Sequence, residues 1–178
     1  MSITKPLVVG MGRVGSLIAL LLAELGMQVA GVDMETLPSI PANVDFTSAD
    51  ITDPHILAGL CRDKDAVIVC LPYHLILGVA QVAHQLGIHY FDLTEDVATT
   101  RAIRTLAASA DAVMISQNGL APGLIGMLGS YLVQQFEPGT LRHTQRGFVK
   151  QEDIPLLAFL NTTTGHLFAE HHPALRTL

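Results

Sequence analysis

The sequence predicts an α/β protein built on a doubly wound parallel sheet of about six strands. Short apolar runs alternate with segments of helical periodicity up to about residue 136. A Gly-x-Gly-x-x-Gly turn follows the first apolar run directly. In addition, 49% of the 178 residues are hydrophobic and only 15% are charged, as expected for a sheet covered by helices on both faces. These observations indicate one domain of ordinary size, which we place at residues 1–139.

The glycine turn is the most specific of these features. Its residues are Gly10-Met11-Gly12-Arg13-Val14-Gly15, and the next apolar run ends at Asp33. A strand, glycine turn, helix, strand and acid within about 30 residues are typical of a dinucleotide-binding, or Rossmann, fold. Gly10 permits a sharp turn, Gly12 leaves the pyrophosphate unobstructed, and Gly15 lets the helix pack closely. The helix N-terminus then faces the phosphates, and Asp33 accepts hydrogen bonds from the ribose hydroxyls of the adenosine half. The simpler alternative is a strand-to-helix turn followed by an acid that merely ends a strand.

The first half of the chain contains clear start and stop signals. Gly26 ends the first helix, whose apolar residues fall on one face. Asp53 caps the second helix, and Pro54 fits its first turn. The elements expected here are strands at residues 3–10, 27–33 and 44–46, with helices at residues 13–25 and 54–60.

The second half repeats the alternation of strand and helix. Pro72 stops a buried strand, and Gly87 ends the helix that follows it. Right-handed crossovers between these units predict the strand order 3-2-1-4-5-6. The elements expected here are strands at residues 66–71, 88–92 and 112–116, with helices over residues 75–86, 103–110 and 124–132.

Residues 140–178 show neither a convincing helix nor a strand that completes the sheet. We expect an irregular, truncated or divergent tail there. Metal binding is the alternative to a solvated terminus, but His171 and His172 are adjacent and lack a carboxylate–histidine arrangement, so we expect no metal site. The histidines of this segment are His143, His166, His171 and His172.

Composition and charge exclude several classes of function. The net charge is −6 and no cluster of lysines or arginines is present, so we expect no nucleic-acid partner. No stretch approaches the roughly 18 apolar residues that span a bilayer. Residues 1–6 do not resemble a signal peptide, which favours a cytoplasmic location. Cys61 and Cys70 have no partners at metal-ligand spacing, so we expect them to be small buried hydrophobes.

Ligands of such sheets bind at the carboxyl ends of the strands, so the residues after each strand are the candidate site residues. Asp50 and Ile51 follow the third strand and can hold and cover the adenine ring, although an ordinary polar turn explains Asp50 equally well. Tyr73 follows the fourth strand, where it can face a substrate. Asp92 ends the fifth strand, where a general acid–base role competes with a structural one.

Five motifs follow one another along the chain: the glycine turn, Asp50-Ile51-Thr52-Asp53, Cys70-Leu71-Pro72-Tyr73, His89-Tyr90-Phe91-Asp92-Leu93-Thr94-Glu95 and Gly119-Leu120-Ala121-Pro122-Gly123. Together they resemble the NAD(P)-binding domain of the saccharopine dehydrogenase family. The resemblance covers residues 4–136 and implies an oxidoreductase that transfers a hydride at the C–N bond of an amino acid-derived secondary amine. Members of this family continue into a second, mostly β domain that binds substrate and usually pairs the subunits, and nothing after Gly139 resembles that domain.

The resemblance implies a role for each matching residue. Tyr73 lies nearest the substrate, and Asp92 is the second candidate catalytic residue. A small amino acid-derived substrate would bind in a full-length form, and an apolar face left exposed where the second domain docks favours a homodimer. The residues expected to bind the cofactor are Gly10, Gly12, Arg13, Val14 and Gly15 for the pyrophosphate, Asp33 for the adenosine ribose, Asp50 and Ile51 for adenine, and Leu71 and Pro72 for the nicotinamide ribose.

The expected cofactor is NAD, with NADP as the alternative. Asp33 repels a 2′-phosphate, and Met34-Glu35-Thr36 provide no arginine or lysine to bind one. A hypothesis from a different class is a non-catalytic NAD(H)-sensing domain, because potassium-channel regulatory domains share the glycine turn and the strand-two acid. The brevity of the chain favours the sensing domain, whereas the motifs around Asp92 and Ala121 favour the oxidoreductase.

Overall fold

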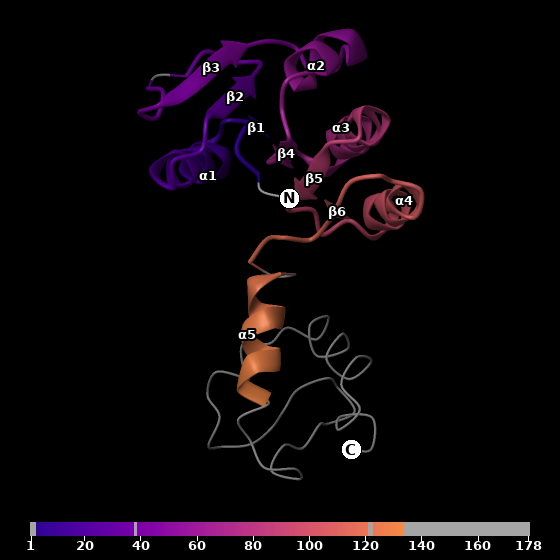
Figure 1. Ribbon diagram of the computed structural model, residues 1–178. Helices are drawn as coiled ribbons and strands as arrows, with labels where there is room; N and C mark the ends of the chain where they lie inside the picture. The colour runs from indigo at the N-terminus through magenta and orange to yellow at the C-terminus, as the bar shows by residue number, and fades with distance from the viewer. Residues whose placement is uncertain (1–2, 38, 121–122, 134–178) are drawn as a thin grey trace. The chain divides into compact units, whose positions relative to one another are not determined.

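A parallel sheet with helices on both faces forms the main part of the structure, a computed structural model that describes residues 3–37, 39–120 and 123–133 (Figure 1). Within these residues the sheet has six strands in the order β3-β2-β1-β4-β5-β6, which confirms the predicted fold class and strand order. The elements are β1 (Pro6–Val9), α1 (Arg13–Glu24), β2 (Val29–Asp33), β3 (Val44–Ser48), α2 (Pro54–Cys61), β4 (Ala66–Val69), α3 (Tyr73–Leu86), β5 (His89–Asp92), α4 (Val97–Ala107), β6 (Met114–Ile115) and α5 (Leu124–Val133).

The chain divides into two compact units, Met1–Asn118 and Gly119–Leu178. The first unit contains the whole sheet together with α1 to α4. The second unit contains α5. The predicted domain boundary at residue 139 and the tail of residues 140–178 lie outside the described residues.

Helices pack on the two faces of the sheet unequally. Figure 1 shows α1 on one side of the sheet and α2, α3 and α4 on the other. Under α1, the small residues Gly15 and Ala19 are buried, and Ala19 packs with Val8 of β1 and Val29 of β2. This arrangement brings the N-terminus of α1 to the carboxyl end of β1, which is where the glycine turn lies.

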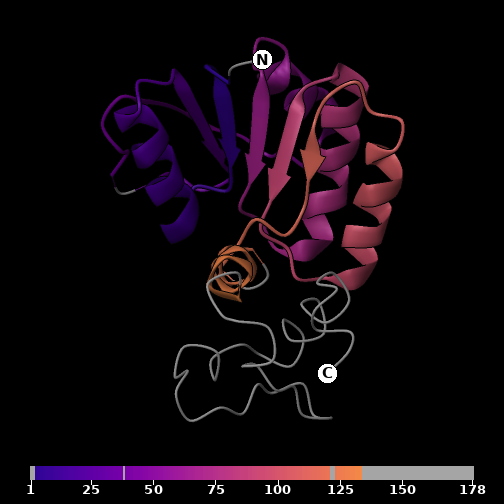
Figure 2. The ribbon, with the colours of Figure 1, turned by 60° about the horizontal axis from the view of Figure 1, so that its bottom comes forward.

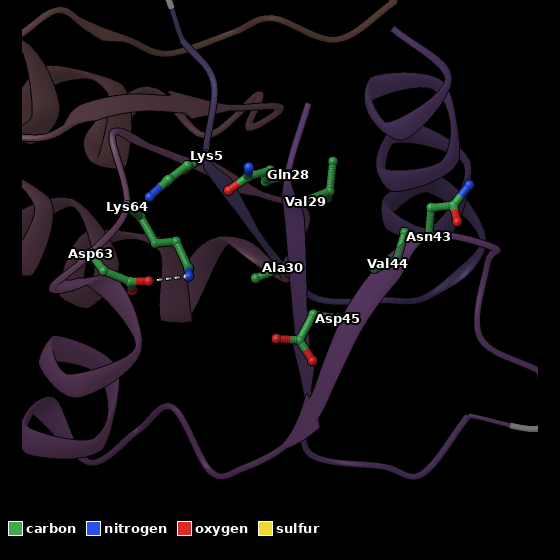
Figure 3. A pocket seen from close by; sticks show the side chains of 9 residues that line it. All are labelled: Lys5, Gln28, Val29, Ala30, Asn43, Val44, Asp45, Asp63 and Lys64. Atoms are coloured by element: carbon green, nitrogen blue, oxygen red, sulfur yellow. Dashed lines mark hydrogen bonds and ion pairs between the residues drawn. The ribbon is translucent and has the colours of Figure 1, made fainter. Parts of the chain in front are cut away.

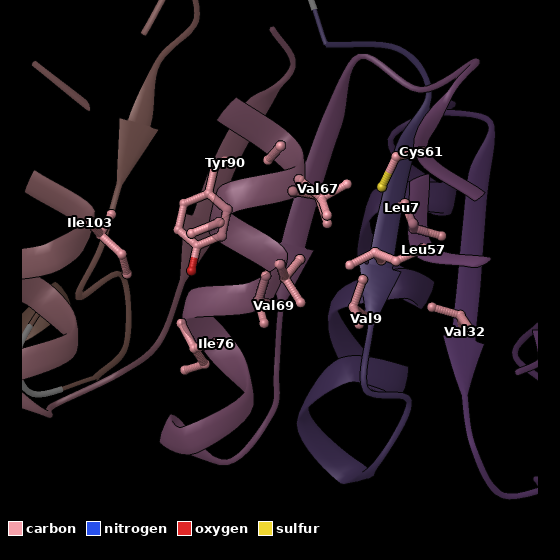
Figure 4. Packing of buried hydrophobic residues seen from close by; sticks show 14 residues of the cluster. Leu7, Val9, Val32, Leu57, Cys61, Val67, Val69, Ile76, Tyr90 and Ile103 are labelled. Atoms are coloured by element: carbon pink, nitrogen blue, oxygen red, sulfur yellow. The ribbon is translucent and has the colours of Figure 1, made fainter. Parts of the chain in front are cut away.

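The larger hydrophobic cluster lies between the sheet and α2 to α4 (Figure 4). Alternate residues of the central strands supply it, because successive side chains of a strand point to opposite faces. Burying one such side chain stabilises the fold by about 1.5–3 kcal/mol. The labelled members are Leu7, Val9, Val32, Leu57, Cys61, Val67, Val69, Ile76, Tyr90 and Ile103.

The first strand is shorter than predicted, because it begins at Pro6 and not at Ile3. The amides of Thr4 and Lys5 donate to the Asp65 carboxylate at 2.6 Å and 2.9 Å. A side chain therefore accepts from these two amides, while the carbonyl oxygens of Thr4 and Lys5 still accept from the Gln28 and Asp65 amides at 2.9 Å and 3.3 Å. Proline is well tolerated as the first residue of a strand because it needs no donor there.

The sixth strand is also shorter than the predicted residues 112–116. The Val113 amide donates to Nδ1 of His89 at 3.1 Å, and the Gln117 amide donates to the Asp92 carboxylate at 3.3 Å. Side-chain acceptors thus replace the strand ladder on both sides of Met114–Ile115. The apolar run was correctly interpreted as a strand, but its ends are set by residues of β5.

The helices begin at residues whose side chains fit those positions. Asp53 accepts a hydrogen bond from the His55 amide at 2.8 Å and caps α2, as predicted. Asp96 caps α4 by accepting from the Thr99 amide at 2.7 Å, and this hydrogen bond lowers the pKa of the Asp96 carboxyl. Among the described helices, none combines the length and apolar character that crossing a membrane requires.

Candidate functional site

Two of the three glycines in the turn are required by the packing of the protein itself. Gly10 has a φ of +90°, and a β-carbon there would lie 2.6 Å from the carbonyl oxygen of Cys70. A β-carbon on Gly15 would collide with the carbonyl oxygen of Gly10. These contacts hold the start of α1 tightly against the ends of β1 and β4.

Gly12 differs, because a β-carbon added there would meet nothing within 4 Å. It occupies the N-cap of α1, and no side chain caps this helix end. No acidic residue lies in the first turn either. The first amide groups and the positive end of the helix dipole therefore face open space, which is the arrangement that binds phosphate groups in dinucleotide-binding folds.

Asp33 is tied directly to the glycine turn. One oxygen of its carboxylate accepts a hydrogen bond from the Met11 amide at 2.7 Å, and the other accepts from the Glu35 amide at 3.1 Å. A carboxylate has about four lone-pair sites, so it can still accept hydrogen bonds from a ligand. The turn and the acid at the end of β2 thus form one hydrogen-bonded unit, in which a carboxylate is fixed beside the open helix N-terminus.

A cleft of about 320 Å³ lies beside this unit, at the carboxyl ends of β4 and β5. Tyr73 is 61% exposed and contacts the His74 ring edge-on, with ring centroids 5.7 Å apart. A cleft with apolar walls and a few polar groups suits a planar ring such as nicotinamide. Its lining residues are Val14, Cys70, Leu71, Tyr73, Leu93, Thr94, Glu95 and Asp96.

Cys70 lines the cleft, but its thiol is not an activated nucleophile. Burial raises the pKa of this thiol to about 11. The reactive form of cysteine is the thiolate, which is therefore scarce near neutral pH. Cys61 is buried elsewhere in the core, and burial likewise raises the pKa of its thiol to about 11.

Asp92 does not line the cleft and is completely buried. Its carboxylate accepts hydrogen bonds from the Tyr90 hydroxyl at 2.8 Å, the Thr94 amide at 2.8 Å and the Ser116 hydroxyl at 2.9 Å. Burial, together with the nearby Asp92 charge, raises the pKa of Tyr90 far above its usual range. These contacts support a structural role for Asp92. Its catalytic role stays a prediction.

Asp50 and Ile51 lie after β3, as predicted. Asp50 is exposed, and one of its oxygens accepts from both the amide and the hydroxyl of Thr52, at 2.9 Å and 2.7 Å. The hydrogen bond from the Thr52 hydroxyl lowers the pKa of the Asp50 carboxyl. Ile51 is half-buried and packs partly against the main core. The second oxygen of Asp50 has no hydrogen-bond partner among the described residues.

A second hollow, of about 580 Å³, lies at the amino ends of the strands, opposite the end of the sheet that carries the cleft (Figure 3). Lys5, Gln28, Val44 and Lys64 line it, at or just before the amino ends of β1, β2, β3 and β4. Lys64 forms an ion pair with Asp63 at 3.0 Å. This hollow is larger than the cleft but has no glycine turn or helix N-terminus, so it does not fit a dinucleotide.

No metal site is found in the described part of the chain, where no three histidine, cysteine, aspartate or glutamate residues are grouped to hold an ion. The four histidines of the C-terminal segment lie outside that part.

The fold and the glycine turn define a Rossmann-type, nicotinamide dinucleotide-binding domain. A protein-family comparison specifies it further: residues 7–117 match the model of the saccharopine dehydrogenase NADP binding domain. The chain belongs to this family, as its motifs indicated. A comparison with the sequences of curated proteins found no match.

Solved structures support the fold. Apo histidine-tagged saccharopine dehydrogenase (L-Glu forming) from Saccharomyces cerevisiae matches with a TM-score of 0.66 and 21% identity, over 74% of this chain and 31% of that chain. MoeE5 in complex with UDP-glucose and NAD matches with a TM-score of 0.52 and 17% identity, over 63% of this chain and 52% of that chain. The chain thus spans about a third of the yeast enzyme and about half of MoeE5.

The structure brings most of the predicted site residues to one edge of the sheet. The glycine turn, Asp33, Leu71 and Tyr73 lie at the carboxyl ends of β1, β2 and β4. The sequence prediction missed Leu93 and Thr94, which also line the cleft, although their position just after β5 was a usable signal. It also missed the hydrogen bond between Asp33 and Met11, which no sequence pattern reveals.

Proposed function

We propose that this chain is the cofactor-binding part of an oxidoreductase of the saccharopine dehydrogenase type, with NAD preferred over NADP. The carboxylate of Asp33, hydrogen-bonded to the glycine turn through the Met11 amide at 2.7 Å, is the observation that carries the proposal. Membership of the NADP-binding family supports a dinucleotide ligand, and the open N-terminus of α1 fits its pyrophosphate.

The residues present fit a dinucleotide laid across the carboxyl ends of the strands. The pyrophosphate lies over the N-terminus of α1, and the nicotinamide half extends toward the cleft at β4 and β5. This arrangement leaves Tyr73, exposed at the start of α3, nearest the substrate. The proposed contacts are Gly10, Gly12, Arg13, Val14 and Gly15 for the pyrophosphate, Asp33 for the adenosine ribose, Asp50 and Ile51 for adenine, and Leu71 and Pro72 for the nicotinamide ribose.

The proposed reaction is hydride transfer at the C–N bond of an amino acid-derived secondary amine. A bound nicotinamide supplies or accepts the hydride at its C4 atom. The chain itself binds and orients the ring in the cleft, whose apolar walls exclude water from one side. A small amino acid-derived substrate binds in a full-length form, in keeping with the 31% of the yeast enzyme that the chain covers.

Electrostatics favour NAD over NADP. A 2′-phosphate would meet the Asp33 carboxylate and lie near Glu35, which is exposed. The adjoining residues Met34 and Thr36 carry no compensating positive charge. A site rejects a ligand most effectively when binding brings like charges together, so the residues after β2 select against the phosphorylated cofactor.

Calorimetric titration of NADH and NADPH into the 178-residue chain tests the proposal. We expect NADH to bind more tightly than NADPH by about tenfold, and Asp33→Asn to reduce this preference because the charge is lost while an acceptor for Met11 remains. Asp45→Asn is the matched control, because Asp45 is exposed on β3 at the opposite edge of the sheet. A folded chain that binds neither nucleotide refutes the cofactor assignment, and tighter binding of NADPH refutes the preference.

A further inference from the structure

Helix α1 is apolar on two sides, and the described residues of the unit Met1–Asn118 cover only one of them. Ala19 and its neighbours Ile18 and Leu22 pack against the sheet. A second row, which we call the α1 stripe, consists of Val14, Leu17, Leu21 and Leu25, each between 49% and 74% exposed. A helix that is apolar over most of its circumference is usually buried on more than one side.

The N-terminal end of the α1 stripe lies beside the end of β4. Val14, at its N-terminal end, lines the cleft together with Cys70 and Leu71, which follow β4. Within the unit Met1–Asn118, Figure 2 shows no helix over β4, β5 and β6 on the side of the sheet that carries α1. Ile115 of β6 is 44% exposed. The four exposed side chains of the stripe lie in one row and are therefore not the singly scattered apolar exposure that needs no explanation.

The two charged residues of α1 identify a partner for the stripe. Arg13 and Glu24 are the first and last residues of the helix, about three turns apart at 3.6 residues per turn. They therefore lie on the same flank of the stripe but about 16 Å from each other, too far for an ion pair. Each also opposes the helix dipole, because the positive charge is at the N-terminus and the negative charge at the C-terminus.

An antiparallel copy of the same helix resolves both conflicts. A two-fold axis through the middle of the stripe brings Leu17 of one copy against Leu21 of the other. The same operation places Arg13 of each copy beside Glu24 of the other, and a C2 contact repeats each pairing twice. The charges then complement the dipole of the facing helix as well as each other.

We propose that two copies of this chain associate through antiparallel α1 helices, with the α1 stripe as the apolar seam and the Arg13–Glu24 pairs at its two ends. The stripe spacing of three and four residues is that of helices which pack along a common seam. The association requires no substrate or nucleotide, but it shares Arg13 and Val14 with the proposed pyrophosphate contacts, so it is measured on the chain without nucleotide.

Sedimentation velocity of the 178-residue chain over about a hundredfold range of concentration tests the proposal. We expect a concentration-dependent dimer. Leu17→Glu buries a charge in the seam and weakens the dimer by about a hundredfold or more. Leu86→Glu is the matched control, because Leu86 is 40% exposed at the end of α3 on the other face of the sheet. Circular dichroism verifies that each variant is folded.

A charge exchange tests the orientation of the pair. Glu24→Arg and Arg13→Glu each place like charges together at both ends and weaken the dimer by about two- to tenfold. The double variant restores opposite charges and recovers the affinity. A chain that sediments as a monomer at every concentration overturns the proposal. So does a dimer that Leu17→Glu leaves intact, or one that Leu86→Glu weakens equally. A double variant no better than the singles overturns the antiparallel arrangement.

Discussion

A β-carbon at Gly10 would lie 2.6 Å from the carbonyl oxygen of Cys70, whereas one at Gly12 would meet nothing within 4 Å. The two glycines therefore differ in what requires them. Gly10 is needed for folding, because its φ of +90° and the nearby carbonyl exclude other residues. No described atom requires a glycine at position 12, and we propose that the pyrophosphate of the bound dinucleotide does.

Alanine substitutions separate these two roles. Gly10→Ala is expected to destabilise the fold by more than about 1 kcal/mol, because of strain and the contact with Cys70. Gly12→Ala is expected to lower the midpoint of thermal unfolding less than Gly10→Ala, because alanine is only a poorer N-cap residue, and to weaken NADH binding by about tenfold or more. Thermal denaturation and calorimetric titration of both variants measure the two effects. Unchanged NADH affinity in Gly12→Ala would show that the pyrophosphate does not lie over this residue.

At the scale of the elements, Asp92 joins the end of β5 and the residues just after it to the segment that follows β6. Its carboxylate accepts from Tyr90 on β5, from Thr94 before α4, and from Ser116 after β6. The Asn118 amide donates to the carbonyl oxygen of Asp92 at 2.8 Å. Asp92 thus holds the residues after β6 beside the end of β5, in addition to the pairing of the two strands themselves.

Removing this carboxylate is expected to loosen the β5–β6 edge. Asp92→Ala leaves several buried donors without an acceptor and should destabilise the fold by about 2–4 kcal/mol. Tyr90→Phe is the control, because it removes one donor while the others keep their acceptor, and should cost about 1 kcal/mol. Urea denaturation measures both. A loss of turnover in a longer form without any loss of stability would instead favour the predicted catalytic role of Asp92.

The elements and their order could be predicted from the sequence, because buried parallel strands appear as unbroken apolar runs and their helices have one apolar face. The ends of β1 and β6 could not, because they depend on Asp65 and Asp92, which are distant in the chain from the residues they bind. The burial of Asp92 could not be predicted from the sequence either, since a carboxylate at a strand end is usually exposed. In the candidate site, the glycine turn and Asp33 were recognisable from spacing, whereas the cleft depends on how β4 and β5 pair.

At the scale of the whole molecule, one compact unit contains every residue that we propose to contact the dinucleotide. The unit Met1–Asn118 includes the complete sheet, and the family match ends at residue 117. The last hydrogen bonds that close the sheet edge are those of Ser116, Gln117 and Asn118 with Asp92. The unit therefore carries its own core and its own closing contacts.

A fragment of residues 1–118 is accordingly expected to fold cooperatively and to bind NADH with an affinity within about threefold of that of the whole chain. A fragment of residues 1–110 is the control. It lacks β6 and the donors of Ser116 and Gln117, so the buried Asp92 carboxylate keeps only part of its hydrogen bonds and the fold should lose its cooperative transition. Thermal unfolding followed by circular dichroism, with titration of NADH, compares the three chains. If the 1–118 fragment folds but no longer binds NADH, residues beyond Asn118 take part in holding the cofactor, and the proposed set of contacts is incomplete.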